Sequence, residues 1–383
     1  MKEKTICYLT QEYAKGATWI YCANLAEELS RTSNWKPFII AANRDKQATQ
    51  DETKDYKLIL TETSDSKFFY SRQFWKNSRV EVDKINPTLV HGNMNLLSSL
   101  GIKKKTTPII ETVHTTFNRE KEGAKAESNF ALSWVEKRVR YFYPWLRRIE
   151  KKLLHRADHL IAVSDTIKEE LIHNYSVNED KITVIPNGVN INLHKRITKQ
   201  IYKKKEDDFV LGFLARMTAS KGARMLLPIL HQVKQTIPGI KLLLAGDDLN
   251  TKQYMVKQIE KYSLQDNVVN LGYIYDLNKK NSFFSTLDMF LLPSSHEGMS
   301  LTILEALSCK TPILASEGAV TFDHMDSIIV TPRTVKDFSE KIIELYKNRE
   351  KLENKKEISR RVAESFTWEN TAKLTQSVYE KVV

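Results

Sequence analysis

Two glutamates lie close together in the segment "SSHEGMSLTILEALSCKTPILAS", which begins at residue 294. Glu297 follows the apolar run "MFLLPSS", which predicts a buried strand, and Glu305 lies among the aliphatic residues of a predicted helix. Ser300 is placed to be the N-cap of that helix. Because the free N–H groups and the positive dipole end of a helix N-terminus attract anions, this strand–helix loop is suited to a phosphate.

The two carboxylates are not expected to bind that phosphate themselves, because their negative charges would repel it. We expect Glu297 and Glu305 to contact neutral hydroxyl groups on either side of the phosphates, as carboxylates contact ribose hydroxyls in dinucleotide sites. A ligand with phosphates in the middle and hydroxyls at both ends is a nucleoside diphosphate sugar. The alternative is that Glu305 lies on the solvated face of its helix and that Glu297 is an ordinary loop acid.

A second strand–loop–helix segment, "VLGFLARMTASKGARMLLPIL", carries two cations in its loop. Arg216 offers a planar fork of donors and Lys221 offers a point charge, and together they suit a diphosphate. The alternative is that both are surface charges. The sequence has no Asp-x-Asp after a predicted strand to hold a divalent metal. We therefore expect a site without metal or cofactor, in which the cations stabilise the departing diphosphate.

Short apolar runs alternate with helical stretches along nearly the whole chain. One series contains "KTICYLT", "PFIIAAN", "PTLVHGN", "TPIIETVH" and "HLIAVS", and a second contains "FVLGFLAR", "KLLLAGD", "VVNLGYI", "MFLLPSS", "TPILASE" and "SIIVTP". Apolar runs without alternation indicate strands buried on both faces of a parallel sheet. The polar stretch "NINLHKRITKQIYKKKEDD" separates the two series. The sequence therefore predicts an α/β protein with two doubly wound domains, residues 1–190 and 191–365, facing each other across a cleft.

The 383 residues carry a formal net charge of +12, which favours acidic partners such as phosphates, nucleic acid or anionic lipid. A nucleic-acid-binding protein is disfavoured because the sequence has no helix-turn-helix, RNA-binding sheet signature or zinc spacing. A non-catalytic sugar-binding receptor is disfavoured because no export signal is visible. No apolar run is long enough to cross a membrane. The three cysteines are far apart and odd in number, which indicates reduced thiols in a cytoplasmic protein.

The segment "SWVEKRVRYFYPWLRRIEKKLLHR" mixes aromatic and basic residues. Between Trp134 and Arg156, eight side chains are basic and two are acidic. An exposed helix of this composition is predicted to lie on an anionic membrane surface. The expected contacts to the membrane or the acceptor are Trp145, Arg147, Arg148, Lys151 and Lys152. The alternative is that the aromatics are core residues and that Pro144 interrupts the helix.

In their order along the chain, "HLIAVSDTIKEEL", "ITVIPNGV", "RMTASKG" and "PSSHEGMSLTILEALSCKTPILAS" resemble retaining glycosyltransferases of the GT-B fold. More narrowly, they are similar to the glycosyltransferase group 1 type with its paired-glutamate motif. The resemblance runs through nearly the whole chain. It implies two Rossmann-like domains that close over the donor, and a C-terminal helix, about residues 366–383, that crosses back to the first domain.

The activity implied by the resemblance is transfer of a hexose from a nucleoside diphosphate sugar to an acceptor hydroxyl, with retention of configuration and without metal. UDP is the expected nucleotide. A lipid-linked or cell-surface glycan precursor is the expected acceptor, on the inner face of the cell membrane. The alternative within the same class is a soluble glycosyltransferase that acts on a small molecule or a sugar phosphate. Burial of the basic aromatic segment would favour that alternative.

The resemblance also assigns roles to individual residues. Arg216 and Lys221 would bind the donor diphosphate and support its departure. Glu305 would bind the ribose hydroxyls, and Glu297 would face the transferred sugar. Phosphate and sugar would meet the backbone at the start of the helix, at Gly298, Met299, Ser300 and Leu301.

Further residues match the family's pattern outside this motif. His114, at the end of the strand in "ETVHTTF", would lie near the sugar and the acceptor. Gly16 lies in the loop "AKGATW", where Lys15 stands in place of a second glycine. Gly272 and Tyr273, in "NLGYIYD", belong to the loop whose backbone meets the nucleobase.

Overall fold

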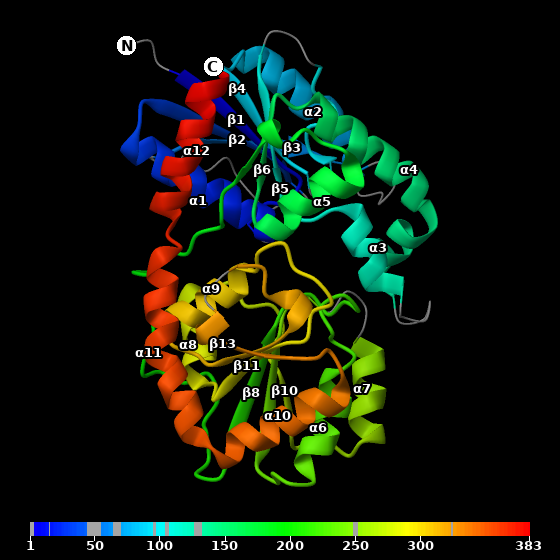
Figure 1. The fold of residues 1–383 in the computed structure, drawn as a ribbon, viewed down its shortest axis with the longest axis vertical. Helices are drawn as coiled ribbons and strands as arrows, with labels where there is room; N and C mark the ends of the chain where they lie inside the picture. Colours follow the sequence, from blue (N-terminus) through cyan, green and yellow to red (C-terminus); the bar gives the residue numbers. More distant parts are fainter. Residues whose placement is uncertain are drawn as a thin grey trace. The chain divides into compact units, whose positions relative to one another are not determined.

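The computed structural model describes residues 4–14, 16–43, 55–63, 70–94, 97–103, 107–125, 132–247, 252–322 and 325–383. The chain forms two compact units. The first comprises residues up to Phe117, the stretch Pro144–Gly188 and the C-terminal stretch Trp368–Val383. The second comprises Asn118–Tyr143 and Val189–Thr367. Each unit is a parallel sheet flanked by helices (Figure 1).

A seven-stranded parallel sheet forms the centre of the first unit, in the order β3-β2-β1-β4-β5-β6-β7. The strands are β1 (Lys4–Thr10), β2 (Trp35–Asn43), β3 (Lys57–Glu62), β4 (Leu89–Asn93), β5 (Ile109–Val113), β6 (His159–Ala162) and β7 (Ile182–Val184). The helices that belong wholly to this unit are α1 (Ala17–Thr32), α2 (Tyr70–Ile85), α5 (Asp165–Tyr175) and α12 (Trp368–Val382), with a 3-10 turn at Glu179–Lys181.

A six-stranded parallel sheet forms the centre of the second unit, in the order β10-β9-β8-β11-β12-β13. The strands are β8 (Phe209–Leu214), β9 (Ile240–Ala245), β10 (Val268–Asn270), β11 (Met289–Leu292), β12 (Ile313–Ser316) and β13 (Ile328–Thr331). The helices are α6 (Leu226–Lys234), α7 (Lys252–Lys261), α8 (Leu277–Thr286), α9 (Leu301–Ser308), α10 (Val335–Lys347) and α11 (Arg349–Ser365), with 3-10 turns at Glu317–Ala319 and Met325–Ser327. Every residue of β11 and β12 is buried, which explains their unbroken apolar sequences.

The predicted fold class, an α/β protein with two Rossmann-like domains, is confirmed. In each sheet the strand order changes direction beside the first strand, between β1 and β4 in one unit and between β8 and β11 in the other. Ligands of such sheets bind at the carboxyl ends of the strands at this switch point. The loops that follow β8 and β11 are therefore the first place to look for a site.

The C-terminal helix belongs to the first unit, as the family resemblance implies. α12 packs on α1, and Tyr379 on α12 joins a buried polar network with Tyr8 and His91. The Tyr8 and Tyr379 hydroxyls are 3.0 Å apart, and His91 Nε2 lies 2.7 Å from Thr112 Oγ1. Burial lowers the pKa of His91 to about 3, so its neutral ring serves the network as one donor and one acceptor. This network fixes α12 to the sheet.

One continuous helix, α4 (Trp134–Arg156), covers the whole basic aromatic segment. The alternative that Pro144 interrupts this helix is therefore wrong. Pro144 is exposed, so water can solvate the carbonyl group that loses its N–H partner there. The residues of α4 up to Tyr143 group with the second unit, together with most of α3 (Phe117–Lys125), although they precede residue 190 in the sequence.

Candidate functional site

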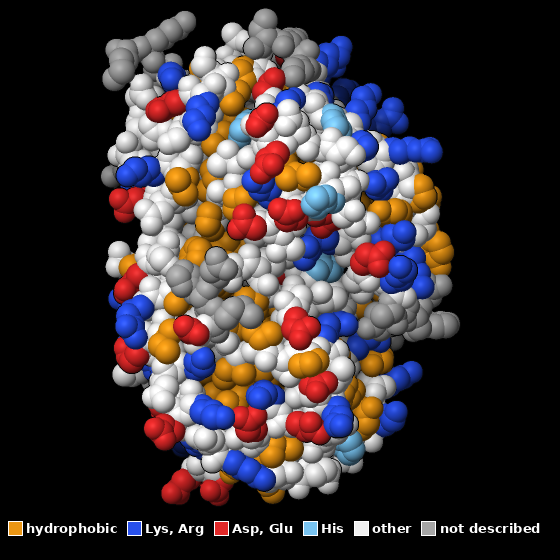
Figure 2. Space-filling model, viewed as in Figure 1, with side chains coloured by type: hydrophobic (Ala, Val, Ile, Leu, Met, Phe, Trp, Pro, Cys, Tyr) orange, Lys and Arg blue, Asp and Glu red, His pale blue; other side chains and the backbone are white. Residues whose placement is uncertain are grey.

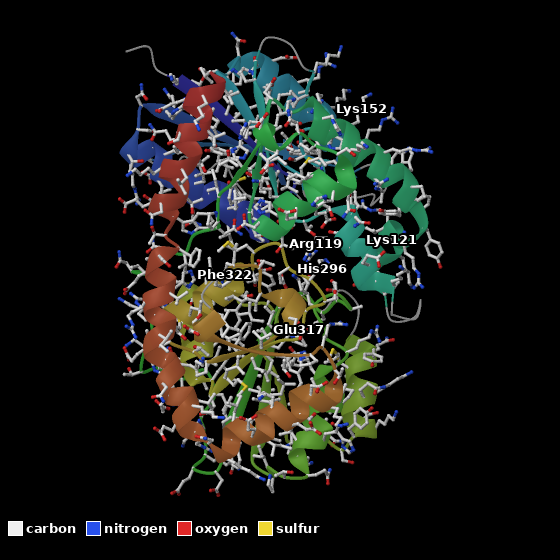
Figure 3. The ribbon with its side chains drawn as sticks, in the orientation of Figure 1. Arg119, Lys121, Lys152, His296, Glu317 and Phe322 are labelled. Atoms are coloured by element: carbon white, nitrogen blue, oxygen red, sulfur yellow. The ribbon has the colours of Figure 1, made fainter. Side chains whose placement is uncertain are left out.

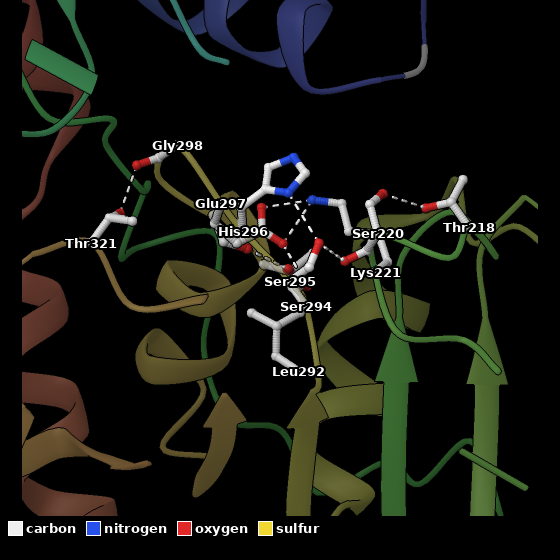
Figure 4. A network of polar contacts seen from close by, with 12 residues as sticks. Thr218, Ser220, Lys221, Leu292, Ser294, Ser295, His296, Glu297, Gly298 and Thr321 are labelled. Atoms are coloured by element: carbon white, nitrogen blue, oxygen red, sulfur yellow. Dashed lines mark hydrogen bonds and ion pairs between the residues drawn. The ribbon is translucent and has the colours of Figure 1, made fainter. Parts of the chain in front are cut away.

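Two loops pack against each other at the switch point of the second sheet. We call residues 215–225 the Lys221 loop and residues 293–300 the Glu297 loop. The N–H of Ser295 donates to the carbonyl of Ser220 at 2.7 Å. Gly222 has φ +73°, and a Cβ added there would lie 2.2 Å from the carbonyl oxygen of Pro293. Glycine is required for this close approach. Figure 4 shows Ser220 and Lys221 of one loop beside Ser294, Ser295 and Glu297 of the other.

Glu297 and Lys221 form an ion pair across these two loops. The Lys221 Nζ lies 2.6 and 2.7 Å from the two carboxylate oxygens of Glu297. Ser294 Oγ donates to the same carboxylate at 2.7 Å (Figure 4). Only 8% of the Glu297 side chain is exposed. Glu297 is thus a buried, paired carboxylate rather than a solvated loop acid.

Glu305 lies on the buried face of α9, and only 4% of the residue is exposed. Its Oε1 accepts from Lys280 Nζ on α8 at 2.9 Å and lies 3.8 Å from His194 Nε2. Burial acts to lower the pKa of Lys280, but the Glu305 carboxylate outweighs it and the pKa is raised. The second oxygen, Oε2, is buried without a hydrogen-bond partner among the described residues. A buried acceptor without a partner is costly, so this oxygen is suited to a hydroxyl from a ligand.

The N-terminus of α9 lies between these two carboxylates. Ser300 is the N-cap residue, as the sequence predicts, but its side chain does not cap the helix. Its Oγ instead lies 2.9 Å from Thr302 Oγ1. Gly298 is held by Thr321, whose Oγ1 donates to its carbonyl at 2.6 Å. Met299 is buried and Leu301 is half-buried. An uncapped helix start of this kind offers its first N–H groups to an anion.

Arg216 stands exposed in the Lys221 loop, just beyond β8. Its charge acts on Glu120 of α3: burial raises the pKa of Glu120, and Arg216 opposes that shift.

In the loop after β10, Gly272 has φ +64° and open space around the position of a Cβ. Tyr273 is 39% exposed, and its ring centroid lies 4.3 Å from that of Tyr275.

In the first unit, His114 lies just beyond β5, at the carboxyl end of the sheet. Its Nε2 lies 2.9 Å from Asn93 Oδ1, and its ring packs edge-on against Tyr21 at 4.8 Å between centroids. Because the Asn93 amide nitrogen donates to Leu9 O, its Oδ1 is the acceptor, so His114 carries its proton on Nε2. Burial lowers the pKa of His114 to about 4, which makes the ring neutral at pH 7.

Gly16 is the N-cap residue of α1, with φ +92°. A Cβ added there would lie 2.3 Å from the carboxylate of Glu12. Glu12 accepts from the Thr18 N–H at 3.2 Å, so an acid of the chain itself occupies this helix start. Sequence reasoning did not single out Glu12, and Lys15 lies outside the described residues.

Three of the aromatic side chains in the middle of α4 are exposed, whereas Tyr143 is half-buried. Tyr141, Phe142 and Trp145 are about 60% exposed, at 61%, 59% and 60%. Arg148 and Lys152 are exposed too, and their spacing from Trp145 places them on the same helix face. Lysine and arginine side chains gather along this part of the surface (Figure 2). No helix among the described residues is long and apolar enough to span a bilayer.

Two of the predicted membrane contacts are less open. Arg147 is half-buried: its Nη2 donates to the carbonyl of Asn174 at 2.6 Å, and its guanidinium lies 5.5 Å from the Tyr175 ring centroid. Lys151 is half-buried as well. The open face of the helix is therefore smaller than the sequence suggests.

Sequence reasoning missed several residues that support the site. Lys280 and His194 face Glu305, and Arg333 donates to Pro293 O at 2.9 Å and to Ala219 O at 3.0 Å, joining the two loops. No sequence signal marks these residues, because they come from other elements. Among the described residues, no group of His, Cys, Asp and Glu is placed to hold a metal ion.

Two family models match the chain. Residues 18–193 match the model described as Glycosyltransferase Family 4, and residues 194–362 match the model described as Glycosyl transferases group 1. The boundary between the two matches falls at the polar stretch that separates the two strand series.

Two curated relatives share about a quarter of the aligned residues. The D-inositol 3-phosphate glycosyltransferase of Paenarthrobacter aurescens is 24% identical over 331 residues, which are 79% of this chain and 76% of the relative. A phosphatidylinositol N-acetylglucosaminyltransferase component of Arabidopsis thaliana is 27% identical over 228 residues, which are 59% of this chain and 50% of the relative.

Solved structures share the fold over nearly the whole chain. The sucrose-phosphate synthase of Thermosynechococcus elongatus has a TM-score of 0.80 at 18% identity and covers 99% of both chains. Anabaena HepE, solved in complex with UDP-glucose, has a TM-score of 0.71 at 17% identity and covers 98% of this chain and 99% of its own. At these identities the likeness establishes the fold.

Proposed function

We propose that this chain, a glycosyltransferase made of a family 4 region and a group 1 region, transfers a hexose from a nucleoside diphosphate sugar to an acceptor hydroxyl with retention of configuration. The observation that carries the proposal is the arrangement around α9. A Lys221–Glu297 ion pair precedes the helix, and the buried carboxylate of Glu305 lies within it with one unpartnered oxygen among the described residues.

The diphosphate is proposed to bind at the start of α9. The N–H groups of Met299, Ser300 and Leu301 would donate to its oxygens, and Arg216 would approach from the Lys221 loop. Lys221, which lies within 2.7 Å of both Glu297 oxygens, would then be shared between Glu297 and the diphosphate. Sharing allows one ammonium group to compensate two neighbouring anions.

The nucleoside is proposed to bind beside Glu305. A ribose hydroxyl would donate to Glu305 Oε2 and so satisfy a buried oxygen that is costly to leave without a partner. The exposed ring of Tyr273 and the open space beside Gly272 would meet the base. UDP is the proposed nucleotide. Anabaena HepE, which has a similar fold and was solved with UDP-glucose, supports this choice.

In the proposed reaction, the bond between the anomeric carbon and the diphosphate oxygen breaks, and the acceptor oxygen forms its bond on the same face of the sugar. The acceptor proton passes to the departing diphosphate, so the step needs no protein nucleophile. Lys221, Arg216 and the N-terminus of α9 would stabilise the charge that grows on the diphosphate. Glu297 would hold hydroxyls of the transferred sugar, and His114, neutral at pH 7, would act as a hydrogen-bonding group for the sugar or the acceptor.

A donor hydrolysis screen tests this function. Purified protein is incubated with a panel of UDP-, GDP- and ADP-linked sugars, and free nucleoside diphosphate is measured. We expect slow release from a UDP-linked hexose and much less from the others. Release from a GDP-linked sugar alone would show that the donor nucleotide is GDP instead of UDP. Release from none of the sugars, together with no binding of any nucleoside diphosphate, would overturn the proposed activity.

The acceptor is proposed to be a lipid-linked or cell-surface glycan precursor reached at an anionic membrane. The exposed aromatic and basic face of α4, formed by Tyr141, Phe142, Trp145, Arg148 and Lys152, supports this. The name of the Arabidopsis relative, which includes a phosphatidylinositol, is consistent with it. The alternative, a small phosphorylated acceptor, is favoured by the name of the Paenarthrobacter relative.

Replacing Arg148 and Lys152 by serine is expected to release the protein from anionic vesicles. Each cation near an anionic surface contributes about 1 kcal/mol, so losing two should weaken partition about thirtyfold at low salt. Sedimentation with vesicles that contain phosphatidylglycerol measures this effect. The matched control is Lys336→Ser with Lys351→Ser, which removes the same charge from the second unit.

Trp145→Ser should reduce the part of vesicle binding that high salt leaves intact, and Tyr141 and Phe142 should supply the remainder. UDP affinity should stay unchanged in all of these variants, because α4's open face is not part of the proposed donor site. Equal sedimentation of the Arg148/Lys152 variant and the control would show that the face is ordinary solvated surface.

Activity is expected to survive excess EDTA, because Arg216 and Lys221 supply the charge compensation that a metal gives in other transferases. The measurement is the rate of diphosphate release with and without chelator, on protein dialysed against it. Loss of activity that manganese or magnesium restores would contradict metal independence.

A further inference from the structure

The second unit contains a piece of chain that the sequence places in the first half. Residues 118–143 belong to it by their contacts, and we call their described part, residues 118–125 and 132–143, the α3–α4 segment. Tyr143 Oη donates to Asn118 Oδ1 at 2.8 Å, and Lys121 Nζ lies 4.1 Å from the Tyr143 ring centroid. These contacts tie the two helices to each other.

α3 contacts the Glu297 loop directly. Arg119 Nη2 donates to the backbone carbonyl of Glu297 at 3.2 Å. A Cβ added at Gly123 would lie 2.6 Å from the ring of His296 and 2.7 Å from Ser295 Oγ, so the helix lies as close to the loop as a glycine allows. Figure 3 shows Arg119 beside His296. Burial, with nearby Lys221 and Arg119, lowers the pKa of His296 to about 3, so the ring that packs against α3 is uncharged.

The start of α4 contacts the Lys221 loop. Glu136 Oε2 accepts from the N–H and the hydroxyl of Ser133 at 2.9 and 2.7 Å, which is a capping box at the helix N-terminus. Glu136 Oε1 accepts at 3.2 Å from the N–H of Ser220, which is the residue before Lys221. Buried Ala124, Leu132 and Ala219 pack together beneath these polar contacts.

The segment thus reaches each loop by a different polar contact. Arg119 holds the residue that would face the sugar, and Glu136 holds the neighbour of the lysine that would bind the diphosphate. We propose that Arg119 and Glu136 are positioning residues of the donor site, Arg119 for the Glu297 loop and Glu136 for the Lys221 loop. This proposal rests on the proposed function.

Substitutions at Arg119 and at Glu136 should therefore have different effects, the first on the rate of diphosphate release and the second on UDP affinity. Arg119→Ala removes the side-chain donor to the Glu297 carbonyl, so the sugar is held less well in the reacting geometry while the nucleotide keeps its contacts. We expect kcat for diphosphate release from UDP-glucose to fall about tenfold, since small misplacements at a reacting centre are costly. UDP affinity should stay within about twofold. Arg119→Lys retains a donor and should recover part of kcat.

Glu136→Ala removes the acceptor of the Ser220 N–H, next to Lys221. We expect UDP affinity, measured by calorimetry, to fall about fivefold, because Lys221 must then be ordered when the diphosphate binds. Ser133→Ala is the matched control, since it weakens the α4 cap but keeps the contact between Glu136 and Ser220. Lys125→Ala controls for Arg119, because it removes an exposed cation of α3 whose ion pair is with Glu122 on the same helix.

Hydrogen exchange in the free protein decides the proposal independently of the ligand. Amides of the Glu297 loop should exchange faster in Arg119→Ala, and amides of the Lys221 loop faster in Glu136→Ala, with the controls unchanged. If wild-type protein binds no UDP, the proposed function fails while exchange still tests the two contacts. Equal exchange and equal kinetics in variants and controls, or one uniform loss of protection in both loops, would overturn the positioning roles.

Discussion

Alanine at Lys221 or at Glu305 is expected to weaken UDP binding by roughly 1.5–3 kcal/mol, about ten- to a hundredfold, because each change removes a charged hydrogen bond to the ligand. Lys221 would lose its contact to the diphosphate, and Glu305 its contact to the ribose. Calorimetric titration with UDP measures both. Lys279→Ala is the matched control, since Lys279 is exposed on α8 next to Lys280, which pairs with Glu305.

The Lys221 variant should also lose stability, and this allows its two effects to be separated. Removing the ammonium leaves Glu297 buried without its cation, which is more costly than losing both charges. Lys221→Met combined with Glu297→Gln should therefore recover much of the free energy of unfolding without recovering UDP affinity. Unchanged UDP affinity in both Lys221→Ala and Glu305→Ala would show that the nucleotide binds elsewhere.

Much of this site could be predicted from the sequence because its parts are local. Ser300 is the N-cap of α9, and Glu305 is a carboxylate within a helix whose other residues are mostly apolar. Both follow from a strand–loop–helix pattern within a few residues. The two doubly wound domains follow from two series of buried parallel strands, whereas the strand order within each sheet is given by the structure alone.

The rest depends on contacts between distant parts of the chain, which periodicity does not encode. The sequence indicates separate roles for Lys221 and Glu297, and nothing in its pattern shows that they form one ion pair. Lys280 has the pattern of an ordinary surface lysine of α8. The grouping of residues 118–143 with the second unit was missed as well, although Ser133-x-x-Glu136 is a recognisable capping-box pattern.

A separate buried acid lies in the centre of the first sheet. Glu111, on β5, is 1% exposed and accepts a hydrogen bond from Ser99 Oγ. Its Oε2 has no hydrogen-bond partner among the described residues, and a Cβ added at Gly92 would lie 2.4 Å from that oxygen. Burial raises the pKa of Glu111 to about 7, while Ser99 and the charge of Arg156 act against the shift. The folded protein therefore holds this proton more tightly than the unfolded chain does.

Glu111→Gln is expected to change how stability depends on pH. The stability gained from proton binding at Glu111 is fully present below its unfolded pKa of about 4.5 and is lost as pH rises through about 7. Above pH 7 the buried carboxylate should cost on the order of 3 kcal/mol relative to its neutral form. Glutamine resembles the neutral acid, so the variant should be more stable than wild type at pH 8 and nearly equal to it at pH 5. Urea unfolding at both pH values measures this, with Glu62→Gln, at an exposed position of β3, as the control. If glutamine instead destabilises the protein equally at both pH values, Arg156 keeps Glu111 ionised in the fold.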